Sequence, residues 1–449
     1  MGKLFGTDGV RGVANEMLTA ELAFKIGQAG AYVLTKHKCG KAKIIVGKDS
    51  RISGDMLEAA LSAGICSVGG EVVSLGVIPT PAVAYLTGKY NADAGVMISA
   101  SHNPMEYNGI KFFDCGGYKL SDEIENEIEA HIFKDCADIE KVTHNNIGRI
   151  THTDSAAEDY ISFAASQAGC RFDGKKIVLD CANGASHITS PELFRRLGAE
   201  VITINDNPDG TNINQNCGST HIEGLRAAVR ENGADAGFAY DGDADRCLSV
   251  DENGELVDGD KMMLICAKNM KDEGKLKNNT LVVTVMSNLG LIIAAGENDI
   301  KTVQTKVGDR YVLENMLENG HSIGGEQSGH IILLDRNTTG DGLLSSIMIM
   351  SVMIKTGRKL SELAEIMKVL PQSLVNAHVS EEYKTKYIEI PEIANEIEAL
   401  KTKFDGKGRV LIRPSGTEPL VRVMIEGENI DEITKDAENL AALIEKMCK

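Results

Sequence analysis

The chain has 449 residues, of which 65 are Asp or Glu and 47 are Lys or Arg, and its formal net charge is −18 at pH 7. This acidic balance argues against a nucleic-acid or anionic membrane partner. Trp is absent and aromatic residues make up 4% of the chain, so platforms for base stacking are not expected. Hydrophobic residues at 43% and charged residues at 25% are typical of a globular protein, and the length suggests about three domains.

Other features of the sequence limit where in the cell the protein is expected and which cysteine chemistry it can carry. The longest apolar run, residues 343–354, is shorter than the roughly 18 residues that span a bilayer. The start of the chain has no apolar signal-peptide core, so we expect a cytoplasmic protein. The ten cysteines include no Cys-x-x-Cys pair, which disfavours zinc and redox motifs and favours reduced, mostly buried thiols. Glycine exceeds its usual share of about 7%, which indicates tight turns or close approaches to ligand.

Short β-branched runs alternate with helical patterns over the first three-quarters of the chain, which is typical of βαβ units. They give three sets of three predicted strands, at residues 43–47, 71–75 and 94–99, then 176–180, 200–204 and 236–240, then 280–286, 300–304 and 322–325. The last strand of each set leads into a polar loop. This pattern predicts a weak threefold repeat of one α/β domain, with chance alignment as the alternative.

The end of the chain differs from the rest. Strands are predicted at 373–379, 409–412 and 420–425, and two apolar stripes at helical spacing run over residues 393–404 and 433–444. We therefore predict three similar α/β mixed-sheet domains and a smaller α+β C-terminal domain. The predicted boundaries are 1–152, 153–256, 257–368 and 369–449.

The most informative segment carries carboxylates at Asp241, Asp243 and Asp245. Carboxylates at alternating positions of extended backbone point the same way, and we expect Gly242 to relieve the turn. Hard oxygens at this spacing favour a divalent cation, and Arg246 beside them suits a metal-bridged phosphate. The alternative is a solvated acidic turn, which we rank below Mg²⁺ binding.

An EF-hand loop is a competing interpretation of the same segment. It is disfavoured because Arg246 stands where that loop needs Gly. In addition, residues 247–251 and 255–257 have the pattern of a hairpin around Asn253-Gly254.

A second candidate is Ser101, in the loop 99–104 that follows an apolar strand. The carboxyl end of a strand is where open α/β sheets bind ligands, and Pro104 limits how the chain leaves. The segment is not a nucleophile elbow, because Gly-x-Ser-x-Gly is missing. His102 does not form a dyad with its neighbour, since adjacent side chains in extended backbone point apart. Taken alone, a serine that caps a helix is the simpler interpretation.

A third cluster lies between two predicted strands near the end of the chain. Arg413 and Arg422 can bind an oxyanion in bidentate fashion, Ser415 and Thr417 add hydroxyl donors, and Gly416 lets backbone N–H groups converge. This pattern predicts a phosphate site, with a plain hairpin turn as the alternative.

Other glycine-containing or charged loops complete the set of candidates, at residues 5–12, 47–51, 108–111, 306–310 and 325–330. Each alone is more simply a surface turn. Together they supply the cations that an acidic chain would need for an anionic substrate.

In this order, the loops resemble those of the α-D-phosphohexomutase superfamily, and residues 5–12 and 325–330 are most similar to bacterial phosphoglucosamine mutases. The resemblance covers residues 6–422. It implies four domains around a central cleft and interconversion of glucosamine 6-phosphate and glucosamine 1-phosphate, on the route to UDP-N-acetylglucosamine and cell-wall precursors.

The resemblance makes Ser101 a phosphoserine that binds one Mg²⁺ per chain together with Asp241, Asp243 and Asp245. The phosphoserine would donate its phosphoryl group to a sugar hydroxyl and form a bisphosphate that turns over in the cleft, and a hexosamine bisphosphate is the expected activator. Phosphoryl transfer depends on positioning and charge neutralisation more than on a strong base, which explains a serine without a triad.

Roles for the remaining residues follow from the same resemblance. Arg11 and Arg246 neutralise the transferring group. Lys111 is the first candidate for proton transfer and His102 the second, because we expect nearby cations to lower the pKa of Lys111. The expected sugar contacts are Lys306, Glu326, Ser328 and His330. The expected contacts of the other phosphate are Arg413, Ser415, Gly416, Thr417 and Arg422.

Two alternatives stay open. One is a sister specificity, phosphomannomutase or phosphoglucomutase, and the other is a non-catalytic sugar-phosphate sensor, which would need neither the serine nor the metal triplet. The expected partners are a small-molecule sugar phosphate and a second copy of the chain in a homodimer, with no nucleic acid and no membrane. We expect an acidic exterior around a cationic pocket, with these cations in loops that face one cleft: Arg11, Lys48, Lys111, Arg246, Lys306, Arg310, Arg413 and Arg422.

Overall fold

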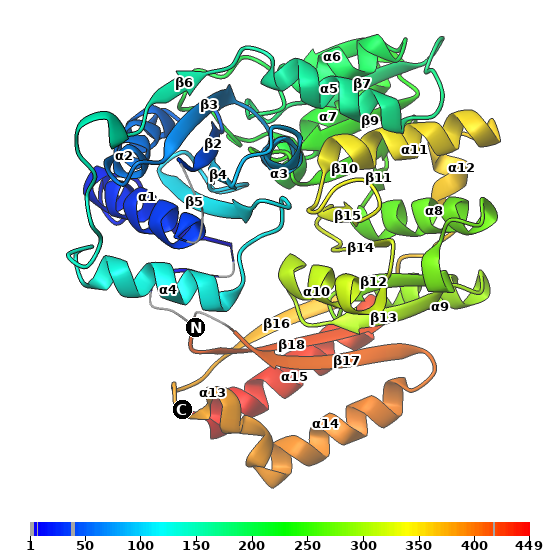
Figure 1. The fold of residues 1–449 in the computed structure, drawn as a ribbon. Helices are drawn as coiled ribbons and strands as arrows, with labels where there is room; N and C mark the ends of the chain where they lie inside the picture. The colour runs from blue at the N-terminus through cyan, green and yellow to red at the C-terminus, as the bar shows by residue number, and fades with distance from the viewer. Residues whose placement is uncertain (1–3, 7, 37–40, 416–417) are drawn as a thin grey trace. The chain divides into compact units, whose positions relative to one another are not determined.

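A computed structural model of the chain describes residues 4–6, 8–36, 41–415 and 418–449. The chain divides into two compact units (Figure 1). Unit 1 runs to Met286 and resumes at Asp299–Ile366, and unit 2 comprises Ser287–Asn298 and Met367–Lys449. Among the helices in the described ranges, none is both long enough and apolar enough to span a membrane.

Unit 1 contains three sheets that share a core of four strands. The first has the order β1-β5-β4-β2-β3-β6, the second β11-β10-β9-β7-β8 and the third β13-β12-β14-β15. In each core, the first three strands along the chain are parallel and the fourth is antiparallel to the third. The spatial order of the four is 2-1-3-4 every time, so the predicted threefold repeat is confirmed.

The strands of these sheets have the following bounds. The first sheet has β1 (Val10–Val13), β2 (Lys43–Lys48), β3 (Glu71–Val77), β4 (Ala94–Ile98), β5 (Tyr107–Asp114) and β6 (Ile150–His152). The second has β7 (Lys176–Asp180), β8 (Glu200–Ile204), β9 (Ala236–Tyr240), β10 (Cys247–Asp251) and β11 (Leu256–Val257). The third has β12 (Thr280–Thr284), β13 (Lys301–Thr305), β14 (Ile323–Gly325) and β15 (Ile331–Leu333).

Helices cover these sheets. Those of the first domain are α1 (Ala20–Thr35), α2 (Ser53–Ser67), α3 (Thr80–Lys89) and α4 (Asp122–Phe133), with a short 3₁₀ turn η1 (His144–Asn146). Next come α5 (Ala156–Gln167), α6 (Thr189–Arg196), η2 (Gly218–Thr220) and α7 (Glu223–Asn232). The third set is α8 (Gly259–Asp272), η3 (Lys277–Asn279), α10 (Asp309–Asn319), α11 (Gly342–Thr356) and α12 (Leu360–Ala364).

The topology places the candidate loops at equivalent positions. In each sheet, the third core strand ends in a loop that turns back into the antiparallel fourth strand. The loop between β4 and β5 carries Ser101, the loop between β9 and β10 carries the three aspartates, and the loop between β14 and β15 carries Glu326. One repeated turn therefore supplies the serine, metal and sugar loops.

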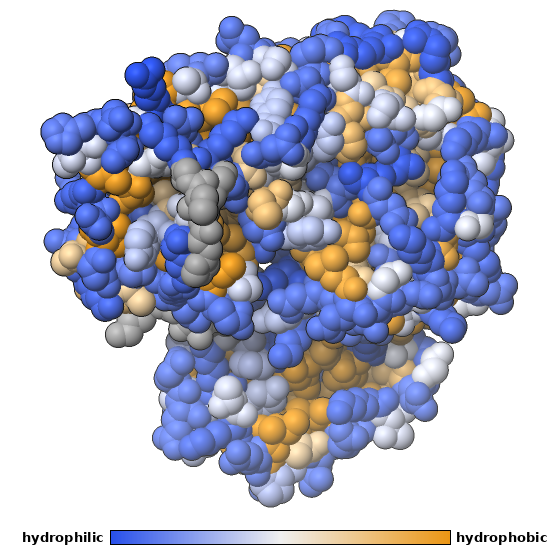
Figure 2. Space-filling view, viewed as in Figure 1, coloured by the Kyte–Doolittle hydropathy of each residue, from blue (hydrophilic) through white to orange (hydrophobic). Residues whose placement is uncertain are grey.

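The apolar run at 343–354 forms the buried helix α11, so its hydrophobic character reflects the core of unit 1. The side chain of Asp341 caps this helix by accepting a hydrogen bond from the Leu344 N–H at 2.9 Å. Hydrophilic residues cover most of the face of the molecule seen in Figure 2. Seven of the nine described cysteines are buried, as expected for inert thiols.

Unit 2 has an antiparallel sheet of order β16-β18-β17. Its elements are β16 (Gln372–His378), β17 (Gly408–Pro414), β18 (Leu420–Gly427), α9 (Leu289–Glu297), α13 (Tyr383–Lys386), η4 (Tyr387–Glu389), α14 (Pro391–Phe404) and α15 (Ile430–Met447). The two predicted apolar stripes are the buried faces of α14 and α15. The predicted small α+β fold is confirmed.

The strands that sequence reasoning missed have specific causes. β5 contains Asn108 and Lys111, polar residues that read as a loop but are buried because the fold gives them partners. β1, β6 and β15 are only four, three and three residues long. The hairpin of β10 and β11 forms around Gly254, as predicted, which excludes an EF-hand in this segment.

Candidate active site

Ser101 lies at the turn that follows β4, and its side chain points toward the metal loop. Its hydroxyl donates a hydrogen bond to Oδ2 of Asp241 at 2.6 Å, and the residue is 2% exposed. The backbone of Ser101 has a φ of 53°, in the left-handed region that a serine rarely adopts. The serine and metal loops, 140 residues apart in sequence, are therefore in direct contact.

The three aspartates of the metal loop converge. Ligand oxygens of Asp241, Asp243 and Asp245 lie within 4.8 Å of one another, and all three residues are buried. The segment is a turn, not the extended backbone that we predicted, and Ala244 rather than Gly242 takes the left-handed conformation. Gly242 is required for another reason: a Cβ there would lie 2.6 Å from the carbonyl oxygen of Ser101.

This donor set fits a divalent cation. In the described part of the chain, Oδ1 of Asp243 and Oδ1 of Asp245 are buried and find no hydrogen-bond donor. The second oxygen of Asp243 accepts from Thr80 Oγ1 at 2.6 Å and from Lys111 Nζ at 2.9 Å, so one oxygen is oriented and the other is free. Burial and the charges of Asp245 and Asp243 raise the pKa of Asp241 well above its usual range. A cation would relieve this repulsion.

A cavity of about 310 Å³ lies beside these loops. It is lined by Asp8, Arg11, Ser101, Lys119, Asp245, Arg246, Val307, Gly308, Asp309, Glu326 and His330. Most of the predicted catalytic and sugar-contacting residues of unit 1 thus line or adjoin one cavity. Lys306 and Ser328 are exposed and stand outside this lining, and Lys306 Nζ lies 5.6 Å from the centroid of the Tyr311 ring.

The surroundings of Lys111 are opposite to those we expected. Its ammonium group is 2.9 Å from Asp243, 3.0 Å from Asp8 and 3.9 Å from Asp245. Burial alone would lower the pKa of Lys111, but these carboxylates outweigh it and raise the pKa. The expectation that nearby cations lower it is wrong, because acidic neighbours dominate, and Lys111 carries a charge in this state.

His102 is held in its neutral form. Burial, followed by the charges of Arg246 and Arg11, lowers its pKa to about 4. Its Nδ1 lies 3.0 Å from a guanidinium nitrogen of Arg246, which donates the hydrogen bond, and 3.3 Å from the Ser101 hydroxyl. The expectation that the Ser101 and His102 side chains point apart is wrong, because Ser101 has a left-handed and not an extended backbone. A histidine with so low a pKa is a weak base. The hydrogen bond from Arg246 instead indicates that His102 orients the Arg246 side chain near Ser101.

Three charged residues that line the cavity were not assigned from the sequence: Asp8, Lys119 and Asp309. Lys119 bridges the two acids, at 2.6 Å from Asp8 and 2.5 Å from Asp309, and Asp8 also pairs with Arg11. Asp8 and Asp309 lie within the candidate loops 5–12 and 306–310. A charged residue next to a glycine was therefore the feature that could have identified them. Lys119 follows Gly116-Gly117, a turn that could have been marked in the same way.

His330 lies between two carboxylates. Its Nδ1 is 3.6 Å from Asp245 and its Nε2 is 3.4 Å from Asp309. Burial lowers its pKa, but the two carboxylates outweigh burial and raise it. His330 therefore links the metal loop to α10.

The prediction of a cationic pocket is wrong in its simple form. Four carboxylates line the cavity together with two arginines, one lysine and one histidine. Two of the expected cations are engaged by other acids: Lys48 by Asp55 and Glu58, each at 2.5 Å, and Arg310 by Asp122 at 2.6 Å. Part of this negative charge belongs to Asp245, one of the three aspartates that would hold a divalent cation. A bound cation would offset that charge and leave the cavity less repulsive to a phosphate group.

The predicted phosphate loop belongs to unit 2. Arg413 on β17 and Arg422 on β18 are directly opposite each other in the antiparallel pair. Burial and the charge of Arg422 lower the pKa of Arg413. Ser415 is buried, and Gly416 and Thr417 lie outside the described residues. Like charges directly opposite each other destabilise a sheet. Such a pair of arginines is typical of a site that binds an anion, because the anion offsets their repulsion.

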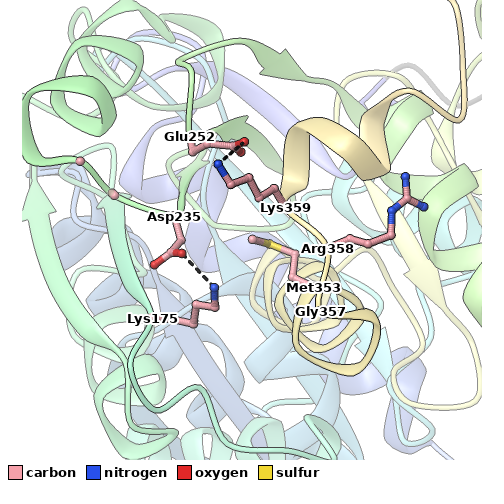
Figure 3. Close-up of a pocket in the computed structure, with 9 residues that line it drawn as sticks. Lys175, Asp235, Glu252, Met353, Gly357, Arg358 and Lys359 are labelled. Carbon is pink, nitrogen blue, oxygen red and sulfur yellow. Dashed lines mark hydrogen bonds and ion pairs between the residues drawn. The ribbon is translucent and has the colours of Figure 1, made fainter.

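Figure 3 shows a second cavity of unit 1, of about 230 Å³. Its charges pair with one another: Lys175 lies 2.9 Å from Asp235, and Lys359 lies 4.0 Å from Glu252. The Arg358 side chain points away from these pairs (Figure 3). None of the predicted site residues lines this cavity, so it is not a candidate for the active site.

Comparison with known proteins gives a consistent result. Four domain families match in order: phosphoglucomutase/phosphomannomutase alpha/beta/alpha domain I over residues 2–137, domain II over 154–254, domain III over 258–370, and the C-terminal domain over 374–443. The chain is 61% identical to the phosphoglucosamine mutase of Clostridium novyi, over 99% of each chain. It is 60% identical to that of Clostridium tetani, over the whole of both.

A solved structure supports the fold alone. A phosphoglucomutase/phosphomannomutase family protein from Burkholderia thailandensis is 22% identical, with a TM-score of 0.82 over 99% of this chain and 98% of that one. Sequence identity of about 60% along the full length is decisive for the family. The chain belongs to the phosphoglucosamine mutases of the α-D-phosphohexomutase superfamily, a family of isomerases.

Proposed function

We propose that this chain interconverts glucosamine 6-phosphate and glucosamine 1-phosphate through a phosphorylated Ser101 and a bisphosphorylated sugar. The observation that carries the proposal is the hydroxyl of Ser101, which opens on the cavity and lies 2.6 Å from Asp241. A binding protein would need neither a buried serine nor three converging carboxylates beside it.

Asp241, Asp243 and Asp245, with the Ser101 oxygen or its phosphoryl group, would hold one Mg²⁺. When bound, this ion would polarise the phosphoryl group as a Lewis acid. Asp243 is prepared for the task, because Thr80 and Lys111 fix one of its oxygens and leave the other free.

The chain's own cations would then stabilise the transferring group. Arg246 is oriented by His102, and Arg11 is oriented by Asp8. Both line the cavity beside Ser101, where they can neutralise charge that spreads over the phosphoryl oxygens. Lys111, protonated and buried, adds a fixed positive charge and holds Asp243 in place.

Glu326 and His330 are the proposed sugar contacts within the cavity, with Lys306 and Ser328 as outer contacts. The Glu326 carboxylate accepts a hydrogen bond from the Gly308 N–H at 3.1 Å, which fixes it at the cavity wall. Arg413, Ser415, Gly416, Thr417 and Arg422 are proposed to bind the phosphate that is not transferred.

The proposal also includes a hexosamine bisphosphate activator, a cytoplasmic location and a homodimer. Analytical ultracentrifugation tests the homodimer, and a sedimentation coefficient of a monomer at micromolar concentration would remove it.

Ser101→Ala is the direct test of the mechanism. It should abolish both the phosphoenzyme, measured by intact mass spectrometry, and turnover of glucosamine 6-phosphate, because no other group can carry the phosphoryl between half-reactions. Ser50→Ala is a matched control, because Ser50 donates to the Asn183 carbonyl oxygen and does not line the cavity. Full activity in Ser101→Ala would refute the mechanism.

The rival specificities are tested on the same preparation. Values of kcat/KM for glucosamine, glucose and mannose 6-phosphates should favour glucosamine. A higher kcat/KM for mannose 6-phosphate or glucose 6-phosphate would mean that the proposed substrate is wrong and the proposed reaction type is right. If none of the three is turned over, the sugar-phosphate sensor is favoured.

A further inference from the structure

Arg51 lies in the turn between β2 and α2, and its side chain is completely buried. It donates hydrogen bonds to four backbone carbonyl oxygens, those of Ser101 at 2.9 Å, Asn103 at 2.8 Å and Pro104 at 2.5 Å in the serine loop, and that of Tyr107 at 3.1 Å at the start of β5. A guanidinium presents five donors in a fixed plane, which no other side chain offers. One residue therefore fixes the path of the whole loop.

The backbone N–H of Ser101 is held by the same group. It donates to Ser99 Oγ at 2.9 Å, and Ser99 Oγ donates to Asp49 Oδ2 at 2.6 Å. Arg51 Nε donates to that same carboxylate oxygen at 2.9 Å. The N–H and the C=O of Ser101 are thus both tied to the Asp49–Arg51 pair, one through Ser99 and one directly.

This double tether coincides with a strained backbone. Ser101 has a φ of 53°, which costs a residue with a side chain about 1 kcal/mol or more and persists only where its surroundings impose it. The left-handed turn directs the hydroxyl toward Asp241 instead of along the strand. Asn214 adds support from the second domain, with hydrogen bonds to the Ser101 and Asn103 carbonyl oxygens at 2.9 and 3.1 Å.

We propose that Arg51 is a positioning residue for phosphoryl transfer: it imposes the left-handed turn that aims the Ser101 oxygen at the metal loop. The inference rests on the proposed function, since it assigns a role in transfer from Ser101. Arg51 does not line the cavity, and in the described part of the chain no hydrogen bond or ion pair joins it to Asp241, Asp243 or Asp245, so its effect on catalysis passes through the backbone of the serine loop. In-line transfer is sensitive to displacements of about 1 Å, which can cost about 100-fold in rate.

The test is Arg51→Lys, which keeps the charge beside Asp49 but cannot reach four carbonyl oxygens. The kcat should fall about 100-fold while the KM for glucosamine 6-phosphate stays within about threefold. Calorimetry with Mg²⁺ alone should still show binding, because the three aspartates are unchanged, and the affinity should fall only by the contribution of the displaced Ser101 oxygen. Arg336→Lys is the matched control: Arg336 donates to the Gln167 carbonyl oxygen at 2.6 Å elsewhere in unit 1, and its loss should leave kcat unchanged.

A folded Arg51→Lys variant with the wild-type kcat would overturn the inference, and so would a rise in KM that accounts for the whole loss of kcat/KM. Ser99→Ala is a smaller change that keeps the test available if Arg51→Lys does not fold. It removes the link to the Ser101 N–H and should lower kcat about tenfold at constant KM, and an unchanged kcat would again overturn the inference.

The two proposals fail differently. A wild-type protein that shows no turnover refutes the proposed function, and this inference with it. An active wild type combined with an unaffected Arg51→Lys and Ser99→Ala refutes only the positioning role.

Discussion

At the scale of single residues, the chemistry of the site depends on side chains that share partners. The two oxygens of Asp243 have different surroundings, one bound by Thr80 and Lys111 and the other buried without a donor. A buried carboxylate oxygen without a donor is unfavourable, and a bound cation would give this oxygen the partner that it lacks among the described residues.

Asp243→Asn tests this reading. An amide is a weaker metal ligand and removes one negative charge, so the affinity for Mg²⁺ should fall at least about tenfold by calorimetry. Asp272→Asn, on the exposed surface of α8, should leave the isotherm unchanged. If Asp243→Asn binds Mg²⁺ as the wild type does, this loop is not the metal site.

Polar residues after predicted strands correctly marked the position of the candidate site. The charges in the sequence did not predict the electrostatic surroundings of Lys111. The sequence placed Ser101 and the aspartates correctly in polar loops after buried strands, because apolar strands and polar loops are local patterns. It could not show that Lys111 is surrounded by Asp8, Asp243 and Asp245, because these residues come from distant parts of the chain. A pKa depends on such long-range neighbours, so its direction was predicted with the wrong sign.

At the scale of elements, α4 and α10 meet through Arg310. This arginine on α10 lies 2.6 Å from Asp122 and 3.5 Å from Glu125, both on α4. Glu125 is largely buried, and burial raises its pKa to about 7 although Arg310 opposes the shift. The folded protein therefore binds a proton at Glu125 more tightly than the unfolded chain does.

The sign of the pH dependence follows from this difference. The contribution of Glu125 to stability is fully present below its ordinary pKa of 4.5 and is lost as the pH rises through about 7. Glu125→Gln keeps the neutral form, so at pH 8 it should be more stable than the wild type by up to about 3 kcal/mol, with little difference at pH 5. Urea denaturation at the two pH values measures this.

Glu314→Gln is the control, because Glu314 also pairs with Arg310, at 3.4 Å, but is mostly exposed. It should show no such difference between pH 5 and pH 8. A Glu125→Gln variant that is less stable than the wild type at pH 8 would show that the ion pair with Arg310 outweighs burial.

The prediction of strands succeeded where both the hydrophobic pattern and the length of the segment were typical of a buried strand. The strands β7, β8 and β9 were predicted residue for residue, because each is a short apolar run between helices. β5 was missed because Asn108 and Lys111 give it a polar pattern, and only the tertiary partners of these residues make it a buried strand. Lys111 also lies beside Asp243 and Asp245 of the proposed metal loop, so the local pattern failed next to the proposed site.

At the scale of the whole molecule, the predicted site residues belong to two units. Unit 1 contains the serine, metal and sugar loops, and unit 2 contains Arg413 and Arg422. The segment Ser287–Asn298 belongs to unit 2, although it lies within the third predicted domain, and the pattern of single elements gave no signal for this grouping. The proposed domain boundaries remain predictions.

Arg413→Ala tests the contribution of unit 2. A bidentate arginine–phosphate contact is worth about 1.5–3 kcal/mol, so the KM for glucosamine 6-phosphate should rise about 10- to 100-fold. The melting temperature should not fall, because the variant removes a like charge opposite Arg422. Arg358→Ala, on the cavity of Figure 3, should leave the KM unchanged. An unaltered KM in Arg413→Ala would remove this loop from the substrate site.

The central claim is that Ser101 carries the phosphoryl group between the two positions of the sugar. Rapid mixing of ³²P-labelled phosphoenzyme with unlabelled glucosamine 6-phosphate and Mg²⁺ measures this transfer in a single turnover. The label should leave the protein and appear first in glucosamine 1,6-bisphosphate, and Ser101→Ala should take up no label. Label that stays on the protein while glucosamine 1-phosphate forms would contradict this claim.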